Sequence, residues 1–119
     1  MLKVAEEMKV QITEFTVAPF VSSDAGKSYH EWFVEFEQPP ASMDEFSARL
    51  DIALRGKNVY YDDLIGGSIL KPLKLTPVRK NGFIDYMKSI GKLGGQNKVP
   101  RLSNDRKIAD ELIKWTENH

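Results

Sequence analysis

The residues best suited to chemistry lie in one basic, glycine-rich segment near the C-terminus, from Gly91 to Asp105. Its cationic side chains are Lys92, Lys98 and Arg101, and it contains no acidic residue before Asp105. Lysine and arginine bind phosphate and carboxylate groups, and glycine allows backbone conformations that other residues exclude. A loop of this length inside a compact domain is usually functional or disordered. Composition alone therefore leaves two readings open, an anion-binding loop and a solvated connector.

Charge is distributed unevenly along a chain whose formal net charge is zero. Residues 30–69 contain eight acidic and three basic residues, which gives a net charge of −5. Residues 88–107 contain six basic residues and one acidic residue, which gives +5. A neutral chain is a poor general nucleic-acid binder, so no nucleic-acid partner is expected. The local positive charge instead indicates a small anionic ligand or an acidic partner surface.

Composition also excludes several classes of site. A chain of 119 residues is expected to form one domain. It contains no cysteine, which excludes a disulfide, a thiolate nucleophile and a cysteine-bound metal. Its only histidines are His30 and His119, so no metal site is expected, and a structural role is favoured for His30. No apolar run approaches the ~18 residues of a membrane span, and the N-terminus is too charged for a signal peptide. We therefore expect a cytoplasmic protein with no membrane partner.

Hydrophobic spacing predicts the elements that must position the basic segment. Residues 2–10 favour a short helix, residues 11–21 a strand, and residues 22–28 a hairpin turn. In the next strand, residues 29–36, alternation places Trp32, Val34 and Phe36 on one face and Tyr29, Glu31, Phe33 and Glu35 on the other. His30 would share the face of Trp32. The two faces predict a sheet that is covered by helices.

The second half of the chain adds four helices and one strand. Ser42 and Glu45 form a capping box before an amphipathic helix that includes residues 46–54. A short helix over residues 58–64 and a strand over residues 69–80 follow. Asn81 is expected to cap a helix over residues 83–90, and Gly91 to end it. A last helix follows the basic segment, and its apolar residues Ile108, Ala109, Leu112 and Ile113 are expected to point inward. The pattern predicts an α+β domain with a small, mostly antiparallel sheet of three to four strands, covered by helices, and a long functional loop before the C-terminal helix.

The basic segment also carries a family resemblance. Residues 88–106 read Lys-Ser-Ile-Gly-Lys-Leu-Gly-Gly-Gln-Asn-Lys-Val-Pro-Arg-Leu-Ser-Asn-Asp-Arg. They resemble the C-terminal signature of the auxin-responsive (Gretchen Hagen) family of acyl-acid amido synthetases, and most closely that of its bacterial branch. The core of the match runs from Gln96 to Arg101, with Asn97 at a position that is aromatic in plant members. The strand over residues 29–36 and the helix before the signature are also similar to the family's, in the same order.

The resemblance implies a role in an adenylate-forming enzyme. In this family a large N-terminal domain binds ATP, with Mg²⁺, and a carboxylic acid, and a small mobile C-terminal domain supplies a lysine to the adenylation step. An amino acid amine then attacks the acyl-adenylate. The resemblance makes residues 1–119 that small domain, inactive alone and without a cofactor of its own, and makes the large domain its partner. By the same match Lys98 is the expected catalytic lysine, and Lys92, earlier in the segment, is the second candidate. Lys92 and Arg101 are expected to contact nucleotide phosphate, although Arg101 could instead fix the loop by bonding backbone carbonyls. Gly94, Gly95, Gln96 and Pro100 are expected to set the conformation of the loop.

Two other functions remain open from the sequence. Gly94, Gly95 and Gln96 also form the tripeptide of peptide-chain release factors, which hydrolyse peptidyl-tRNA. Those domains are flanked by strongly basic segments, which this chain lacks. The other alternative is a free-standing regulatory or interaction module whose basic loop binds an acidic partner. Restoration of adenylation by a separately supplied large domain would distinguish the synthetase from both.

Overall fold

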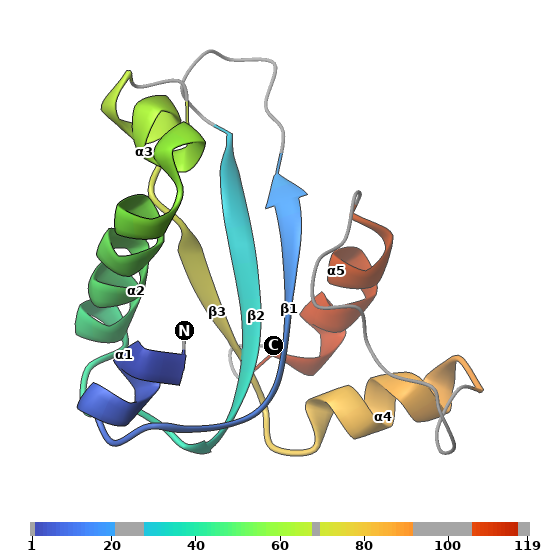
Figure 1. The fold of residues 1–119 in the computed structure, drawn as a ribbon. Coiled ribbons are helices and arrows are strands. Elements are labelled where there is room, and N and C mark those ends of the chain that lie inside the picture. Colours follow the sequence, from blue (N-terminus) through green and yellow to red (C-terminus); the bar gives the residue numbers. More distant parts are fainter. Residues whose placement is uncertain (1, 21–27, 68–69, 92–105, 117–119) are drawn as a thin grey trace.

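The computed structural model describes residues 2–20, 28–67, 70–91 and 106–116. A three-stranded sheet lies between two layers of helices (Figure 1). This confirms the α+β class and the helix-covered sheet. The described elements are α1 (Leu2–Glu7), β1 (Gln11–Phe20), β2 (Tyr29–Gln38), α2 (Met43–Lys57), α3 (Val59–Gly66), β3 (Lys74–Val78), α4 (Gly82–Ser89), α5 (Lys107–Leu112) and the 3₁₀ turn η1 (Ile113–Trp115). No helix in these ranges is long and apolar enough to cross a bilayer.

The strand order is β1-β2-β3, with β2 in the centre of the sheet. Strands β1 and β2 pair antiparallel, as the hairpin prediction requires, whereas β2 and β3 pair parallel. The sheet is therefore mixed. The parallel pair follows from the connection, because α2 and α3 return the chain to the start of β2 before β3 begins (Figure 1). Strand β3 is shorter than its predicted range, and Pro77 lies in it opposite Val34, which the edge position tolerates.

The predicted alternation of β2 is confirmed by two separate cores. Trp32 and Val34 are buried in the cluster beneath α1 and α2, together with Phe46 and Leu50 of α2. Phe33 is buried in the cluster on the opposite face. Because apolar residues cover both faces, any polar side chain of β2 inside the sheet loses contact with water and needs an internal partner.

The layer of α1, α2 and α3 follows the sequence signals closely. The Ser42 side chain accepts a hydrogen bond from the backbone N–H of Glu45, which confirms the capping half of the predicted box. Asn58 caps α3 in the same way by accepting from the N–H of Tyr61, and Gly67 ends that helix. The two local signals thus set where α2 and α3 begin.

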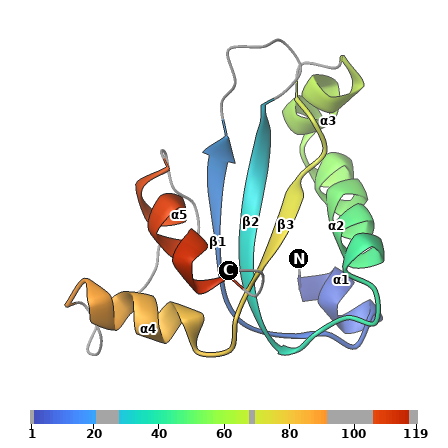
Figure 2. The same ribbon diagram turned by 180° about the vertical axis from the view of Figure 1, so that it is seen from behind.

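The layer of α4, α5 and η1 covers the other face, as the reverse view also shows (Figure 2). Its buried residues include Phe83, Tyr86, Ala109 and Leu112. Ile113 was also expected to point inward, but it is 40% exposed because the helix tightens into η1 there and the 3.6-residue period is lost. The C-terminal turn is bound to the end of β3, where the N–H of Arg79 donates to the carbonyl of Trp115 at 2.9 Å.

Candidate functional site

The basic segment lies between α4 and α5, and the structure describes its two borders, Gly91 and Arg106. The predicted catalytic residue Lys98 lies outside the described residues. So do the other predicted site residues, which are Lys92, Gly94, Gly95, Gln96, Pro100 and Arg101. Their assignments therefore stay predictions. What the structure provides is the frame in which the segment begins and ends.

Helix α4 leads to the first border, and a buried carboxylate of β2 holds the start of this helix. Glu35 Oε2 accepts from the N–H of Asn81 at 3.2 Å, and Oε1 accepts from the N–H of Phe83 at 3.1 Å. The expected side-chain cap by Asn81 is wrong, because Asn81 makes no such bond and adopts a left-handed conformation (φ 65°), which asparagine tolerates. The carboxylate satisfies two free N–H groups of α4 and lies at the positive end of its dipole. At the other end, Gly91 has φ 70°, as a terminating glycine requires.

Close packing at Gly82 fixes α4 further. A Cβ atom at this position would lie 2.4 Å from Val78 Cγ1 and 3.0 Å from the carbonyl oxygen of Trp115. The helix therefore begins in contact with the end of β3 and with the C-terminal turn. Only glycine allows so close an approach.

The second border is set by an ion pair between Arg106 and Glu31. Arg106 Nη1 lies 2.8 Å from Glu31 Oε1, and the other oxygen of Glu31 accepts from the Thr76 hydroxyl at 2.5 Å. Glu31 is 4% exposed. The Arg106 guanidinium also lies over the rings of Phe20 and Phe33, with its carbon 5.7 and 5.9 Å from their centroids. Charge, hydrogen bonding and ring contacts together fix the first residue after the segment.

An open hollow of about 450 Å³ lies beside this ion pair, lined in part by Arg106, Lys74, Thr76 and Tyr29. Of its cationic groups, Arg106 is paired with Glu31, and Arg106 Nε lies 3.5 Å from Asp110 Oδ1. The hollow is therefore not a strongly positive pocket.

The opposite face of the sheet holds a second buried carboxylate network. Asp51 accepts hydrogen bonds from the Tyr61 hydroxyl and, at 3.1 Å, from the backbone N–H of Leu73. Burial is the main cause that raises the pKa of Tyr61 well above its ordinary value, and the hydrogen bond to Asp51 raises this pKa further. His30 stacks on Tyr61 with ring centroids 5.8 Å apart, and burial lowers the pKa of His30. The stacked, half-buried position supports the structural role expected for His30.

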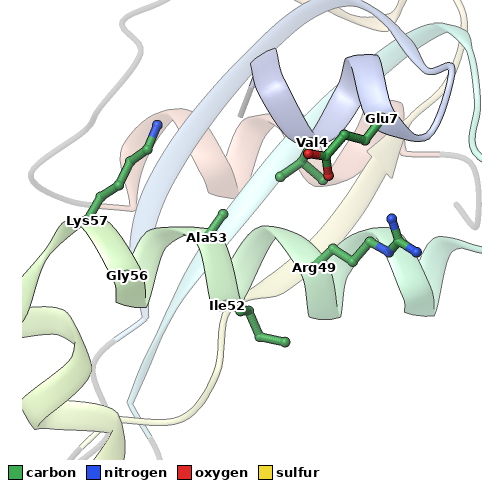
Figure 3. A pocket seen from close by; sticks show the side chains of 7 residues that line it. All are labelled: Val4, Glu7, Arg49, Ile52, Ala53, Gly56 and Lys57. Carbon is green, nitrogen blue, oxygen red and sulfur yellow. The ribbon is translucent and has the colours of Figure 1, made fainter.

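A hollow of about 420 Å³ between α1 and α2 is shown in Figure 3. Val4 and Ala53 lie between the two helices, and Ile52 points away from α1 (Figure 3). Its charged residues Glu7, Arg49 and Lys57 are carried at separate points along the helices (Figure 3). Within the described ranges, no group of three His, Cys, Asp or Glu side chains could hold a metal. The hollow offers no convergent polar groups for a ligand.

The family comparison matches the GH3 family C-terminal domain over residues 1–107 of this chain. The chain belongs to the GH3 (Gretchen Hagen) family. The match includes the basic segment and both of its borders. A search of curated protein sequences found no significant match.

Solved structures of GH3 proteins share the fold. The chain is similar to a GH3.15 acyl acid amido synthetase with a TM-score of 0.71 and 18% identity, over 96% of the chain and 20% of that structure. It is also similar to AtGH3.15 acyl acid amido synthetase in complex with 2,4-DB, with a TM-score of 0.74 and 14% identity, over 96% of the chain and 21% of that structure. The GH3 domain described here thus spans about a fifth of the length of these proteins.

Sequence reasoning missed the two buried carboxylates that hold the start of α4 and Arg106. Glu31 and Glu35 were placed on the correct face of β2, but no role was predicted for either. A signal was available, because the two acids flank the buried Phe33 on a strand expected to be covered by helices. A carboxylate in such a position requires a cation or several N–H donors.

Proposed function

We propose that this chain is the C-terminal lid domain of an acyl-acid amido synthetase of the bacterial GH3 branch, an adenylate-forming enzyme, and that Lys98 acts in its adenylation step. The observation that carries the proposal is the GH3 C-terminal domain match over residues 1–107, which includes the segment around Lys98. The coverage supports a larger enzyme, because the chain spans only 20% and 21% of the two solved structures. In this proposal the partner is a large N-terminal domain, and the protein acts in the cytoplasm.

The chemistry needs a mobile cation. When a carboxylate attacks the α-phosphate of ATP, negative charge develops on that phosphate and on the departing pyrophosphate. The ammonium group of Lys98 is compact and can approach both groups from outside the nucleotide site. Lys92 and Arg101 would contact phosphate beside it. Gly94, Gly95, Gln96 and Pro100 would set the backbone of the segment.

Magnesium-bound ATP, the acyl acid and the amino acid would be held mainly by the large domain. The nucleotide would supply the activated phosphate, and the contribution of this chain would be the positive charge of the basic segment. The isolated chain is therefore expected to release no AMP from ATP with any acid and amino acid.

The test is a pair of lysine substitutions in the two-domain enzyme, or in this chain mixed with its large domain. Lys98→Ala is expected to slow acid-dependent pyrophosphate exchange by about 100-fold, the order of loss when one charge-stabilising group is removed. Lys57→Ala removes an exposed lysine of α2, in the other helical layer, and is expected to leave the rate unchanged. Both variants should show the same thermal unfolding midpoint as the parent within about 2 °C, because Lys57 is exposed and, in this proposal, Lys98 must be accessible to the nucleotide of another domain.

Two outcomes would contradict the proposal. Unchanged pyrophosphate exchange in Lys98→Ala would remove the lysine from adenylation. Failure of the chain to restore adenylation to a separately supplied large domain would argue instead for an interaction module.

A further inference from the structure

A third hollow, of about 460 Å³, lies between the sheet and helix α3 and differs from the other two in its lining. The described residues that line it are mostly ring-bearing, and the rest are aliphatic apart from Asn58. The side chains with rings are those of Phe15, His30, Trp32, Tyr60 and Tyr61. This α3 hollow therefore has the size and the largely apolar lining, with a few polar groups, that small-molecule sites have.

The floor of the α3 hollow is held in place by contacts within the domain. Trp32 and Tyr61 are both buried. Phe15 stacks on Trp32 with the ring centroids 5.6 Å apart, and His30 stacks on Tyr61 at 5.8 Å. The Tyr61 hydroxyl is bound to the buried carboxylate of Asp51, which fixes the plane of the ring. A ligand would thus meet ring faces that are already ordered, and this lowers the entropic cost of binding.

Two neutral polar groups of the α3 hollow have hydrogen-bonding capacity to spare. His30 contacts Tyr61 through its ring face, and its nitrogens make no hydrogen bond with any described residue. Burial lowers the pKa of His30, so the imidazole is neutral near pH 7, where one nitrogen donates and the other accepts. Asn58 uses its side-chain oxygen to accept from the N–H of Tyr61, and its NH₂ group remains as a donor. A hydroxyl or N–H group on a ligand therefore has partners at this site.

The charges of the α3 hollow disfavour an ionic ligand. None of the described residues that line it is Lys, Arg, Asp or Glu. A carboxylate in the hollow would lose hydration without gaining a cation. An ammonium group would gain no carboxylate from the lining, and Asp51 nearby is buried and already accepts from Tyr61 and Leu73. The lining is therefore complementary to an uncharged molecule.

We propose that the α3 hollow binds a neutral, planar aromatic molecule that carries a hydroxyl or N–H group. Its ring would lie against Trp32 and Tyr61, and its polar group would bond to His30 or Asn58. Tyr60 is 83% exposed at the edge of the hollow and gains ring contacts when a ligand binds. The inference goes beyond the proposed function and does not rest on it, because the acyl acid of that reaction is a carboxylate, which this lining disfavours.

The test compares two probes that share one ring system, 2-naphthol and 2-naphthoate, by titration of the chain near neutral pH. Calorimetry is expected to give a Kd of about 1 mM or lower for 2-naphthol, the order expected for a ligand of its size. Binding of 2-naphthoate is expected to be at least about tenfold weaker, because its carboxylate must be desolvated without a partner. Amide NMR shifts caused by 2-naphthol should centre on residues 58–64 and on β2 near His30.

Three variants locate the site. Tyr60→Ala is expected to weaken 2-naphthol binding at least about fivefold, because it removes one ring contact. Val59→Ala is the matched control, since Val59 is 73% exposed on the same helix and does not line the hollow, and it should change Kd by less than about twofold. His30→Phe keeps a ring to stack on Tyr61 but removes both nitrogens, and it should weaken 2-naphthol binding about threefold to tenfold, the value of one hydrogen bond.

Three results would overturn the proposal. They are the absence of 2-naphthol binding at about 5 mM, equal affinities for 2-naphthol and 2-naphthoate, and equal effects of Tyr60→Ala and Val59→Ala. If His30→Phe alters the circular dichroism spectrum, Tyr60→Ala decides alone, because its exposed position leaves the fold intact.

Discussion

Substitution of Glu35 by glutamine should destabilise the domain strongly, although the two side chains are nearly the same in size and shape. The carboxylate is 3% exposed, and each of its two oxygens accepts one backbone N–H at the start of α4. Glutamine retains one acceptor oxygen but presents an NH₂ group to the second N–H. The change therefore turns one hydrogen bond into a donor–donor conflict and removes a negative charge from the helix N-terminus.

The magnitude follows from these two losses. A buried N–H that loses its acceptor costs about 1–3 kcal/mol, and a charge at a helix terminus contributes about 0.3–1 kcal/mol. We expect a decrease of about 3 kcal/mol in the free energy of unfolding. For a domain of this size, about 1 kcal/mol shifts the midpoint by about 4 °C, so the thermal midpoint should fall by about 12 °C.

Urea denaturation of the chain, followed by circular dichroism, measures this difference at constant m-value. Glu37→Gln is the matched control, because it makes the same change on the same strand at an exposed position. It should alter the free energy of unfolding by less than about 0.5 kcal/mol. Equal values for Glu35→Gln and Glu37→Gln would refute the role of Glu35 as the anchor of α4.

Three further predictions concern single residues. In urea denaturation, Gly82→Ala should lower the free energy of unfolding by about 1–3 kcal/mol, because the new Cβ would overlap Val78. Gly56→Ala should raise it by up to about 1 kcal/mol, because no atom lies within 4 Å of its new Cβ. Equal effects of the two substitutions would contradict the close packing at Gly82. Burial raises the pKa of Tyr61, so the unfolded chain releases that proton first and stability should fall as pH rises above 10.0; Tyr61→Phe should flatten this fall. Burial lowers the pKa of His30, so the unfolded chain takes up the proton first and stability should fall as pH drops below 6.5. His30→Gln should remove that slope. For either variant, a curve of stability against pH that runs parallel to the parent's would contradict the role given to that residue.

Local patterns in the sequence were sufficient for much of the fold. The alternation of β2, the cap at Ser42 and the terminating Gly91 depend on residues within a few positions of each other, and all three are confirmed. The direction of β3 was beyond such reasoning, because it depends on where α2 and α3 deliver the chain. The cap of α4 failed for a related reason. Its acceptor is Glu35, 48 positions before Phe83, and not the adjacent Asn81.

In the candidate site, too, the feature that depends on local sequence was predicted and the contacts between distant residues were not. The segment around Lys98 was found by its signature, and the family assignment is confirmed by the match over residues 1–107. The chemistry of Lys98 stays a prediction, because it depends on a phosphate that another domain would bind. The border contacts were not predicted, since Arg106 and Glu31 meet only through the packing of α5 on the sheet.

The arrangement of β2 links folding to the proposed function. A shift of one residue in the register of β2 would turn Glu31 and Glu35 toward the cluster of Trp32 and Val34 and would remove the anchors of both borders. The apolar pattern that fixes the register of β2 therefore also fixes where the basic segment begins and ends. Under the proposed function, Lys98 must stay accessible to a substrate on another domain, so the groups that hold the flanking residues have to lie elsewhere. Buried carboxylates on a central strand can hold α4 and Arg106 in this way, because the two cores hold the strand and no substrate has to reach it.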